Sequence, residues 1–139
     1  MDRTLICTVG LPRSGKSTWA KEQGVPIVNP DSIRLAVYGQ AYWAPGEKMV
    51  WAIVEIMVKS LFSAGCSIVI LDATGTIYEH RLQWQSEDWD TFFKVFDTDL
   101  ETCIDRAIAD NRQDLIPIIQ RMAENYEPLF LDEMRLEDD

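Results

Sequence analysis

Residues that hold metals or cross-link small domains are scarce in this sequence. The chain has one histidine and three widely spaced cysteines, Cys7, Cys66 and Cys103. These cysteines form neither the CxxC pairs of zinc sites nor the even set of a disulfide framework. We therefore expect reduced, mostly buried thiols, no structural metal at His80, and a cytoplasmic protein.

Long apolar runs and positive charge are also in short supply. No run approaches the roughly 18 residues of a membrane helix, and the first residues lack a secretory signal, so we expect no membrane partner. The 23 acidic residues outnumber 13 basic ones, and the net charge is −10. A surface that coats nucleic acid needs a basic field, so a polyanionic substrate would need a locally arranged set of cations.

The composition is that of one soluble domain. The 139 residues are 47% hydrophobic and 26% charged, with no repeat and no Gly/Ser linker. A chain of this size buries roughly 68% of its unfolded surface, which permits a core without staples. We expect one domain over residues 1–126. Residues 127–139 carry six acids against one base and are expected to form a fraying acidic tail.

Strand-type apolar runs alternate with helix-type stretches along the chain. This alternation predicts the α/β class, with a short parallel sheet and helices on both faces. The expected strands are 4–9, 26–28, 67–71 and 91–96, and the expected helices are 16–23, 30–38, 47–64, 78–87, 100–111 and 117–125.

The segment Gly10–Ser17 reads GLPRSGKS and fits G-x-x-x-x-G-K-[ST] at every required position. It follows a predicted strand and opens a predicted helix, which is the context of a phosphate-binding loop. Its amides and Lys16 would hold the phosphates of ATP, and Ser17 would be a ligand of Mg²⁺. Lys16 is also predicted to be catalytic, and the side chain of Arg13 points either to the nucleotide or to solvent. The predicted nucleotide-binding residues are Gly10, Pro12, Arg13, Ser14, Gly15, Lys16, Ser17 and Thr18.

The rest of the sequence narrows the class of P-loop protein. GTPases need a base-selecting N-K-x-D segment, which is absent here. Motor and AAA-type ATPases usually need larger domains, so chain length favours a small kinase with the three-layer P-loop NTPase/kinase fold. A regulatory module that binds ATP without catalysis is the alternative outside the enzymes.

Several blocks resemble the kinase domain of phage-type polynucleotide 5′-hydroxyl kinases. They occur in the same order over residues 4–126. The blocks are Gly10–Ala20, Asn29–Arg34, Val69–Thr74, Glu79–Leu82 with Trp84, and the series Cys103, Arg106, Arg112, Pro117.

The resemblance and the residue chemistry together suggest four roles. Asp31 is the candidate general base for the attacking hydroxyl, and the alternative is a purely structural role as a helix cap. Arg34 lies three residues on and would hold a substrate phosphate, unless it is a surface arginine. Asp72 would orient Arg34, hold Mg²⁺ through water, or serve only as a structural cap. Arg112 is the candidate catalytic arginine of a lid near residues 106–117, and Arg106 is a less favoured candidate for the same role. The alternative for both is a solvent-exposed charge at a helix end.

The resemblance implies transfer of the γ-phosphoryl group of ATP to the 5′-hydroxyl of a polynucleotide or nucleotide. The acidic balance leaves a small-molecule kinase, acting on a nucleoside, sugar or antibiotic, as the first rival. The partners would be ATP and a nucleic-acid 5′ end or a small phosphorylated acceptor, and a homo-oligomer is compatible with the sequence. No phosphatase domain is expected after the kinase domain. Asp72–Thr76 also resembles the nucleophile loop of aspartyl-phosphate phosphatases, but Lys94 is the sole lysine after it.

Overall fold

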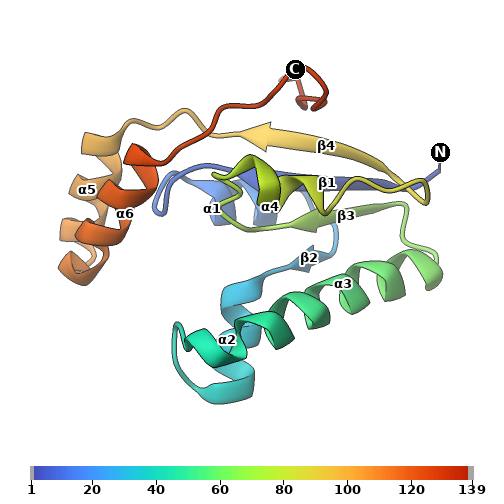
Figure 1. Cartoon of the computed structure of the whole chain (residues 1–139), viewed down its shortest axis with the longest axis horizontal. Helices are drawn as coiled ribbons and strands as arrows, with labels where there is room; N and C mark the ends of the chain where they lie inside the picture. The colour runs from blue at the N-terminus through green and yellow to red at the C-terminus, as the bar shows by residue number, and fades with distance from the viewer. Residues whose placement is uncertain (1, 138–139) are drawn as a thin grey trace.

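A four-stranded parallel sheet forms the centre of the molecule. The structure, a computed structural model, describes residues 2–137. The strand order is β2-β3-β1-β4, so the phosphate-binding loop follows a central strand (Figure 1). The strands are β1 (Thr4–Val9), β2 (Ile27–Val28), β3 (Ile68–Leu71) and β4 (Asp90–Val95).

Helices cover the sheet on both faces, which confirms the predicted fold class. In Figure 1, α4 lies in front of the sheet and α1 behind it. Across residues 2–137, no helix is both long and apolar enough to cross a membrane. The helices are α1 (Lys16–Glu22), α2 (Pro30–Tyr38), α3 (Glu47–Ser63), α4 (Tyr78–Leu82), α5 (Leu100–Ala109) and α6 (Ile116–Glu124), with short 3₁₀ turns η1 (Ala44–Gly46) and η2 (Gln113–Leu115).

The core has two parts. The larger part joins the central strands to α3, whose buried residues recur every four positions and so share one face. The smaller part joins α5 and α6 to the phosphate-binding loop through Leu11. The α5–α6 pair is therefore a separately packed unit at one end of the sheet. The buried α3 residues are Val50, Val54, Val58 and Phe62.

All ten predicted strands and helices are present, and the largest error is at the end of α4. The prediction extends this helix to residue 87, but it ends at Leu82. The Trp84 carbonyl accepts hydrogen bonds from Trp89 Nε1 at 3.1 Å and Thr91 Oγ1 at 2.8 Å. These bonds direct the chain into β4, and both tryptophans enter the core.

The C-terminal segment is ordered against the domain, so the expected fraying is wrong for residues 127–137. The Phe93 amide donates to the Met134 carbonyl at 2.9 Å, and the Leu136 amide donates to the Phe93 carbonyl at 2.8 Å. This short parallel pairing covers part of the outer edge of β4. Asp138 and Asp139, also in the expected tail, lie outside the described residues.

A buried ion pair explains why this acidic segment packs. Arg81 of α4 is 1% exposed, and its Nε and Nη2 donate to the two carboxylate oxygens of Glu133 at 2.8 and 3.0 Å. The carbonyls of Gly75, Glu127 and Pro128 accept its remaining N–H groups. The arginine therefore ties the C-terminal segment to the loop that follows β3.

Candidate active site

A large cleft lies at the carboxyl ends of the strands, where ligands gather in parallel sheets. Its volume is about 1820 Å³. Single-ligand pockets usually measure about 300–1,000 Å³, so this cleft has room for two ligands. Its walls come from the phosphate-binding loop, α2, the first turns of α3, the loop after β3, and the α5–α6 pair.

The phosphate-binding loop has a conformation that only its glycines permit at two positions. Gly15 has φ +102° and stands immediately before α1. A Cβ at Gly10 would lie 2.7 Å from Ser14 Oγ and 3.0 Å from Phe96 Cβ. The loop thus closes tightly and aims the start of α1 into the cleft, as an anion site requires.

Lys16 lies across the inside of this loop. Its side chain is buried, and Nζ donates to the Leu11 carbonyl at 2.6 Å and the Gly10 carbonyl at 3.1 Å. Burial lowers the pKa of Lys16 to about 8. Because these partners are neutral carbonyls, phosphate oxygens would be stronger partners for the ammonium group.

Ser17 and Asp72 offer the oxygen ligands that Mg²⁺ prefers. Ser17 Oγ donates to Asp72 Oδ2 at 2.7 Å, and Asn29 Nδ2 donates to the same oxygen at 3.2 Å. A hydroxyl and one carboxylate are a suitable protein share of a Mg²⁺ site completed by phosphates and water. These residues fit the predicted ion, and the chemistry supports the predicted role of Ser17.

Asn29 also caps α2, so the Asp31 side chain is not needed for capping. Asn29 Oδ1 accepts the amides of Asp31 and Ser32 at 2.8 and 3.2 Å, which makes Asn29 the cap of α2. The capping alternative considered for Asp31 is therefore wrong. The Asp31 side chain is 77% exposed and accepts a hydrogen bond from Arg34 Nη1 at 2.7 Å.

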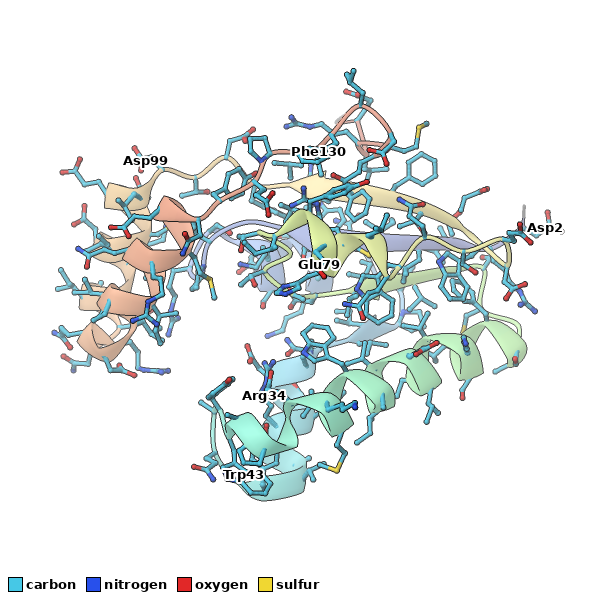
Figure 2. All side chains as sticks on the ribbon, viewed as in Figure 1. Asp2, Arg34, Trp43, Glu79, Asp99 and Phe130 are labelled. Atoms are coloured by element: carbon cyan, nitrogen blue, oxygen red, sulfur yellow. The ribbon has the colours of Figure 1, made fainter. Side chains whose placement is uncertain are left out.

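Arg34 is held at the junction of α2 and α3, where Figure 2 labels it. Glu47 accepts from its Nε at 2.9 Å and from its Nη2 at 2.6 Å. Its side chain is 13% exposed and lines the cleft. The surface-arginine alternative is therefore wrong. Among residues 2–137, the Asp72 carboxylate bonds to Ser17 and Asn29, and Glu47 rather than Asp72 holds Arg34. The sequence argument missed Glu47.

The two candidate lid arginines, Arg106 and Arg112, differ in their contacts. Arg106, the less favoured residue, donates from Nη1 to the Arg13 carbonyl at 3.1 Å and so touches the phosphate-binding loop. Arg112 lines the cleft at its rim and forms an exposed pair with Asp114. Arg13 contacts Asp110 of the lid at 2.8 Å.

Arg121 of α6 also lines the cleft, and the sequence argument missed it. Its only sequence signal is its position on an amphipathic helix. The other predicted loop residues, Pro12, Ser14 and Thr18, all line the cleft. The structure therefore brings every predicted site residue except Gly10 to the cleft wall, and the Gly10 carbonyl accepts a hydrogen bond from Lys16 of that wall.

The chain matches a family model described as AAA domain over residues 5–129. This match covers most of the chain, which therefore belongs to the AAA domain family. This match concerns the domain family, whereas the expectation of a small kinase in place of an AAA-type ATPase concerns the reaction.

Solved structures with similar folds include kinases. A chain in a Pnkp1/Rnl/Hen1 complex is 32% identical with a TM-score of 0.67; the match covers 75% of this chain and 38% of that one. A gluconokinase from Sinorhizobium meliloti 1021 is 15% identical with a TM-score of 0.67, covering 96% and 80% of the two chains. The Mycobacterium tuberculosis APS kinase CysC is 18% identical with a TM-score of 0.61, covering 96% and 87%.

These comparisons establish a P-loop kinase-like fold. The chain spans less than half the length of the matched chains in the two Pnkp1/Rnl/Hen1 structures, at 38% and 46%. The acceptor of the phosphoryl group is a separate question, because the similar folds belong to enzymes named for different substrates.

Proposed function

We propose that this protein is an ATP-dependent kinase that phosphorylates the 5′-hydroxyl of a polynucleotide or nucleotide. One observation carries the proposal: Asp31 and Arg34, paired at 2.7 Å, line the same cleft as the phosphate-binding loop. A carboxylate beside a guanidinium is what a hydroxyl next to a phosphate requires, since one group accepts the proton and the other binds the anion.

The transfer balances with the groups in the cleft. Asp31 accepts the proton of the acceptor hydroxyl. The hydroxyl oxygen forms a bond to the γ-phosphorus while the bond from that phosphorus to the leaving ADP breaks. Lys16 would hold the phosphates, and Arg106 and Arg112 of the lid, with Arg121 of α6, can bring positive charge to them. Bound MgATP supplies the phosphoryl group, with Ser17 and Asp72 as the protein side of the Mg²⁺ site.

The charge of the protein limits how a polynucleotide would bind. The net charge of −10 repels a long acidic strand, so only its end would enter the cleft. The similarity to a chain in a complex named for RNA repair supports a nucleic-acid end as acceptor. The short reach of this contact predicts weak dependence of activity on strand length.

An acceptor panel with γ-labelled ATP and Mg²⁺ tests the proposal. We expect label on 3′-mononucleotides and on oligonucleotides with a 5′-hydroxyl, and little on free nucleosides. Asp31→Asn removes the proton acceptor and is expected to lower turnover about 10²–10⁴-fold while ATP still binds. Lys16→Ala is expected to weaken ATP binding as well as turnover.

The rival functions predict different outcomes of the same panel. The folds of the gluconokinase and the APS kinase extend over 96% of this chain, which keeps a small-molecule hydroxyl as the second candidate acceptor. Label on sugars or free nucleosides, but not on nucleotides, would favour that candidate. Unchanged behaviour of Asp31→Asn in every assay would leave only an ATP-binding module.

A further inference from the structure

We infer that Glu47 is a positioning residue, which fixes the Arg34 guanidinium so that it binds a phosphate adjacent to the reacting hydroxyl. The inference deepens the proposed function and rests on it. Glu47 accepts two parallel hydrogen bonds, from Arg34 Nε at 2.9 Å and Nη2 at 2.6 Å. This side-on fork fixes the plane of the guanidinium as well as its location.

The donor count of Arg34 shows what remains for a ligand. A guanidinium has five N–H donors. Among the described residues, Glu47 takes two of them and Asp31 takes one from Nη1. One N–H on each Nη is left over, on a side chain that lines the cleft. Two neighbouring donors of this kind match two oxygens of one phosphate group.

Glu47 is itself held from the other side. The Tyr38 hydroxyl donates to Glu47 Oε2 at 3.2 Å. The preceding residue, Gly46, lies so close to Tyr38 and Trp43 that a Cβ there would be 2.8 Å from a ring atom of each. Tyr38 and Trp43 also pack edge to face, with ring centroids 5.5 Å apart. The turn from α2 to α3 is thus shaped by packing, and it delivers Glu47 to Arg34.

The charges in the group keep the fork intact. The hydrogen bonds from Arg34 hold the pKa of Glu47 below its usual range, so the carboxylate stays ionised at neutral pH. Arg34 stays charged at any accessible pH. Glu47 and Asp31 both contact Arg34, so recognition by this guanidinium depends on where its remaining N–H groups point.

The expected substrate preference follows from this geometry. An acceptor with a phosphate next to its hydroxyl, such as a 3′-phosphorylated nucleoside, would engage both remaining donors. An acceptor without that phosphate gains nothing from the fixed guanidinium. Glu47 therefore contributes to acceptor selectivity and leaves the binding of ATP unchanged.

The test compares Glu47→Gln with Glu55→Gln, a matched change on the exposed side of α3 where Glu55 pairs with Lys59. Losing an ionic hydrogen bond that fixes a ligand-binding group corresponds to about 10–100-fold in binding. We expect Glu47→Gln to raise the KM for a 3′-phosphorylated oligonucleotide by about tenfold or more, with the KM for ATP within about twofold. Glu47→Asp keeps the charge and should recover part of this loss, and Glu55→Gln should match wild type.

A double-mutant comparison separates positioning from simple structural support. In an Arg34→Ala background, Glu47→Gln should add less than about a twofold effect, because both changes disable one guanidinium. The Arg34 Nε–H signal in a ¹H–¹⁵N spectrum, assigned with Arg34→Lys, should lose its hydrogen-bonded shift in Glu47→Gln. A full additional effect in the Arg34→Ala background, or an unchanged signal and unchanged constants, would overturn the inference.

The same samples distinguish a failure of the proposed function. If wild type labels no 5′-hydroxyl, the proposed acceptor is wrong, and the role of Glu47 can still be tested without turnover by titration with adenosine 3′-monophosphate. Weaker binding by Glu47→Gln than by Glu55→Gln supports the positioning role in that case. Equal binding by the two variants refutes it.

Discussion

Arg81 and Arg34 form the same kind of ion pair in two different parts of the molecule. Each donates from Nε and Nη2 to both oxygens of one glutamate. Arg81 is buried, and the protein accepts all five of its N–H groups. Arg34 faces the cleft, and three of its five are taken by the described residues. A fully satisfied guanidinium holds the fold together, whereas a partly satisfied one in a cleft is available to a ligand.

The largest expected effect is on the free energy of unfolding, and it distinguishes Arg81 from Arg34. Removing one partner of a buried ion pair leaves the other charge without compensation, at a cost of about 3–5 kcal/mol. Arg81→Ala and Glu133→Ala should each lower the free energy of unfolding by about this amount in urea titrations. Arg34→Ala should cost less than either of these changes, because its partners Glu47 and Asp31 keep 21% and 77% of their side chains exposed, so water can replace the lost guanidinium. A similar cost for Arg34→Ala would erase the distinction between the two arginines.

For the KM of the acceptor, substitution of Arg34 should have a larger effect than substitution of Arg81, the reverse of the order for stability. Arg34→Ala removes the anion-binding fork, and the KM for a 3′-phosphorylated acceptor should rise about 10–100-fold, or roughly 1.5–3 kcal/mol. Arg34→Lys keeps the charge but loses the fork, so it should recover only part of the loss. Steady-state rates at saturating ATP measure both variants. Equal KM values for wild type and Arg34→Ala would contradict a role in acceptor binding.

Lys16 is a third cation that sharpens the comparison, because it is buried but contacts neutral carbonyls. Its pKa of about 8 in the free protein should rise when ATP binds, since phosphates favour the charged form. ATP affinity should therefore be full below pH 8 and fall up to about tenfold per pH unit above it. Calorimetry near pH 8.5 in buffers of different ionisation enthalpy should detect proton uptake. Lys16→Arg stays charged, so any ATP binding that it retains should show no such uptake.

The smallest effect belongs to an exposed pair on α3. Lys59 contacts Glu55 at 2.9 Å with both side chains 56% exposed. Lys59→Ala should leave both the free energy of unfolding and the kinetics unchanged within experimental error. Urea titration and the acceptor assay check this expectation. A larger change would mean that ion pairs in this protein cannot be ranked by burial and donor count.

Local sequence patterns predicted most of the fold. Apolar runs and glycine stops predicted every strand and helix, because they record contacts within a few residues. Arg81 and Glu133 are 52 positions apart, and no local pattern links them. The tail therefore looked solvated, although one of its acids is the counter-ion of the most buried arginine. The end of α4 was missed for a similar reason, since contacts from β4 determine it.

The site was predictable where its chemistry is local. The phosphate-binding loop is one continuous motif, and Asp31 and Arg34 lie one helical turn apart. Glu47 is 13 residues from Arg34, on the other side of a turn. In a sequence, an acidic residue at the start of a helix indicates only a favourable interaction with the helix dipole. The lid role of Arg112, a homo-oligomer and a cytoplasmic location stay predictions.

The pairing of Met134 and Leu136 with Phe93 limits how another protein can attach. Strand addition to an exposed edge is a common mode of recognition, because unpaired backbone groups accept a new strand. At Phe93 both backbone groups are already taken from within the chain. A partner that adds a strand at Phe93 must therefore first displace the chain's own C-terminal segment.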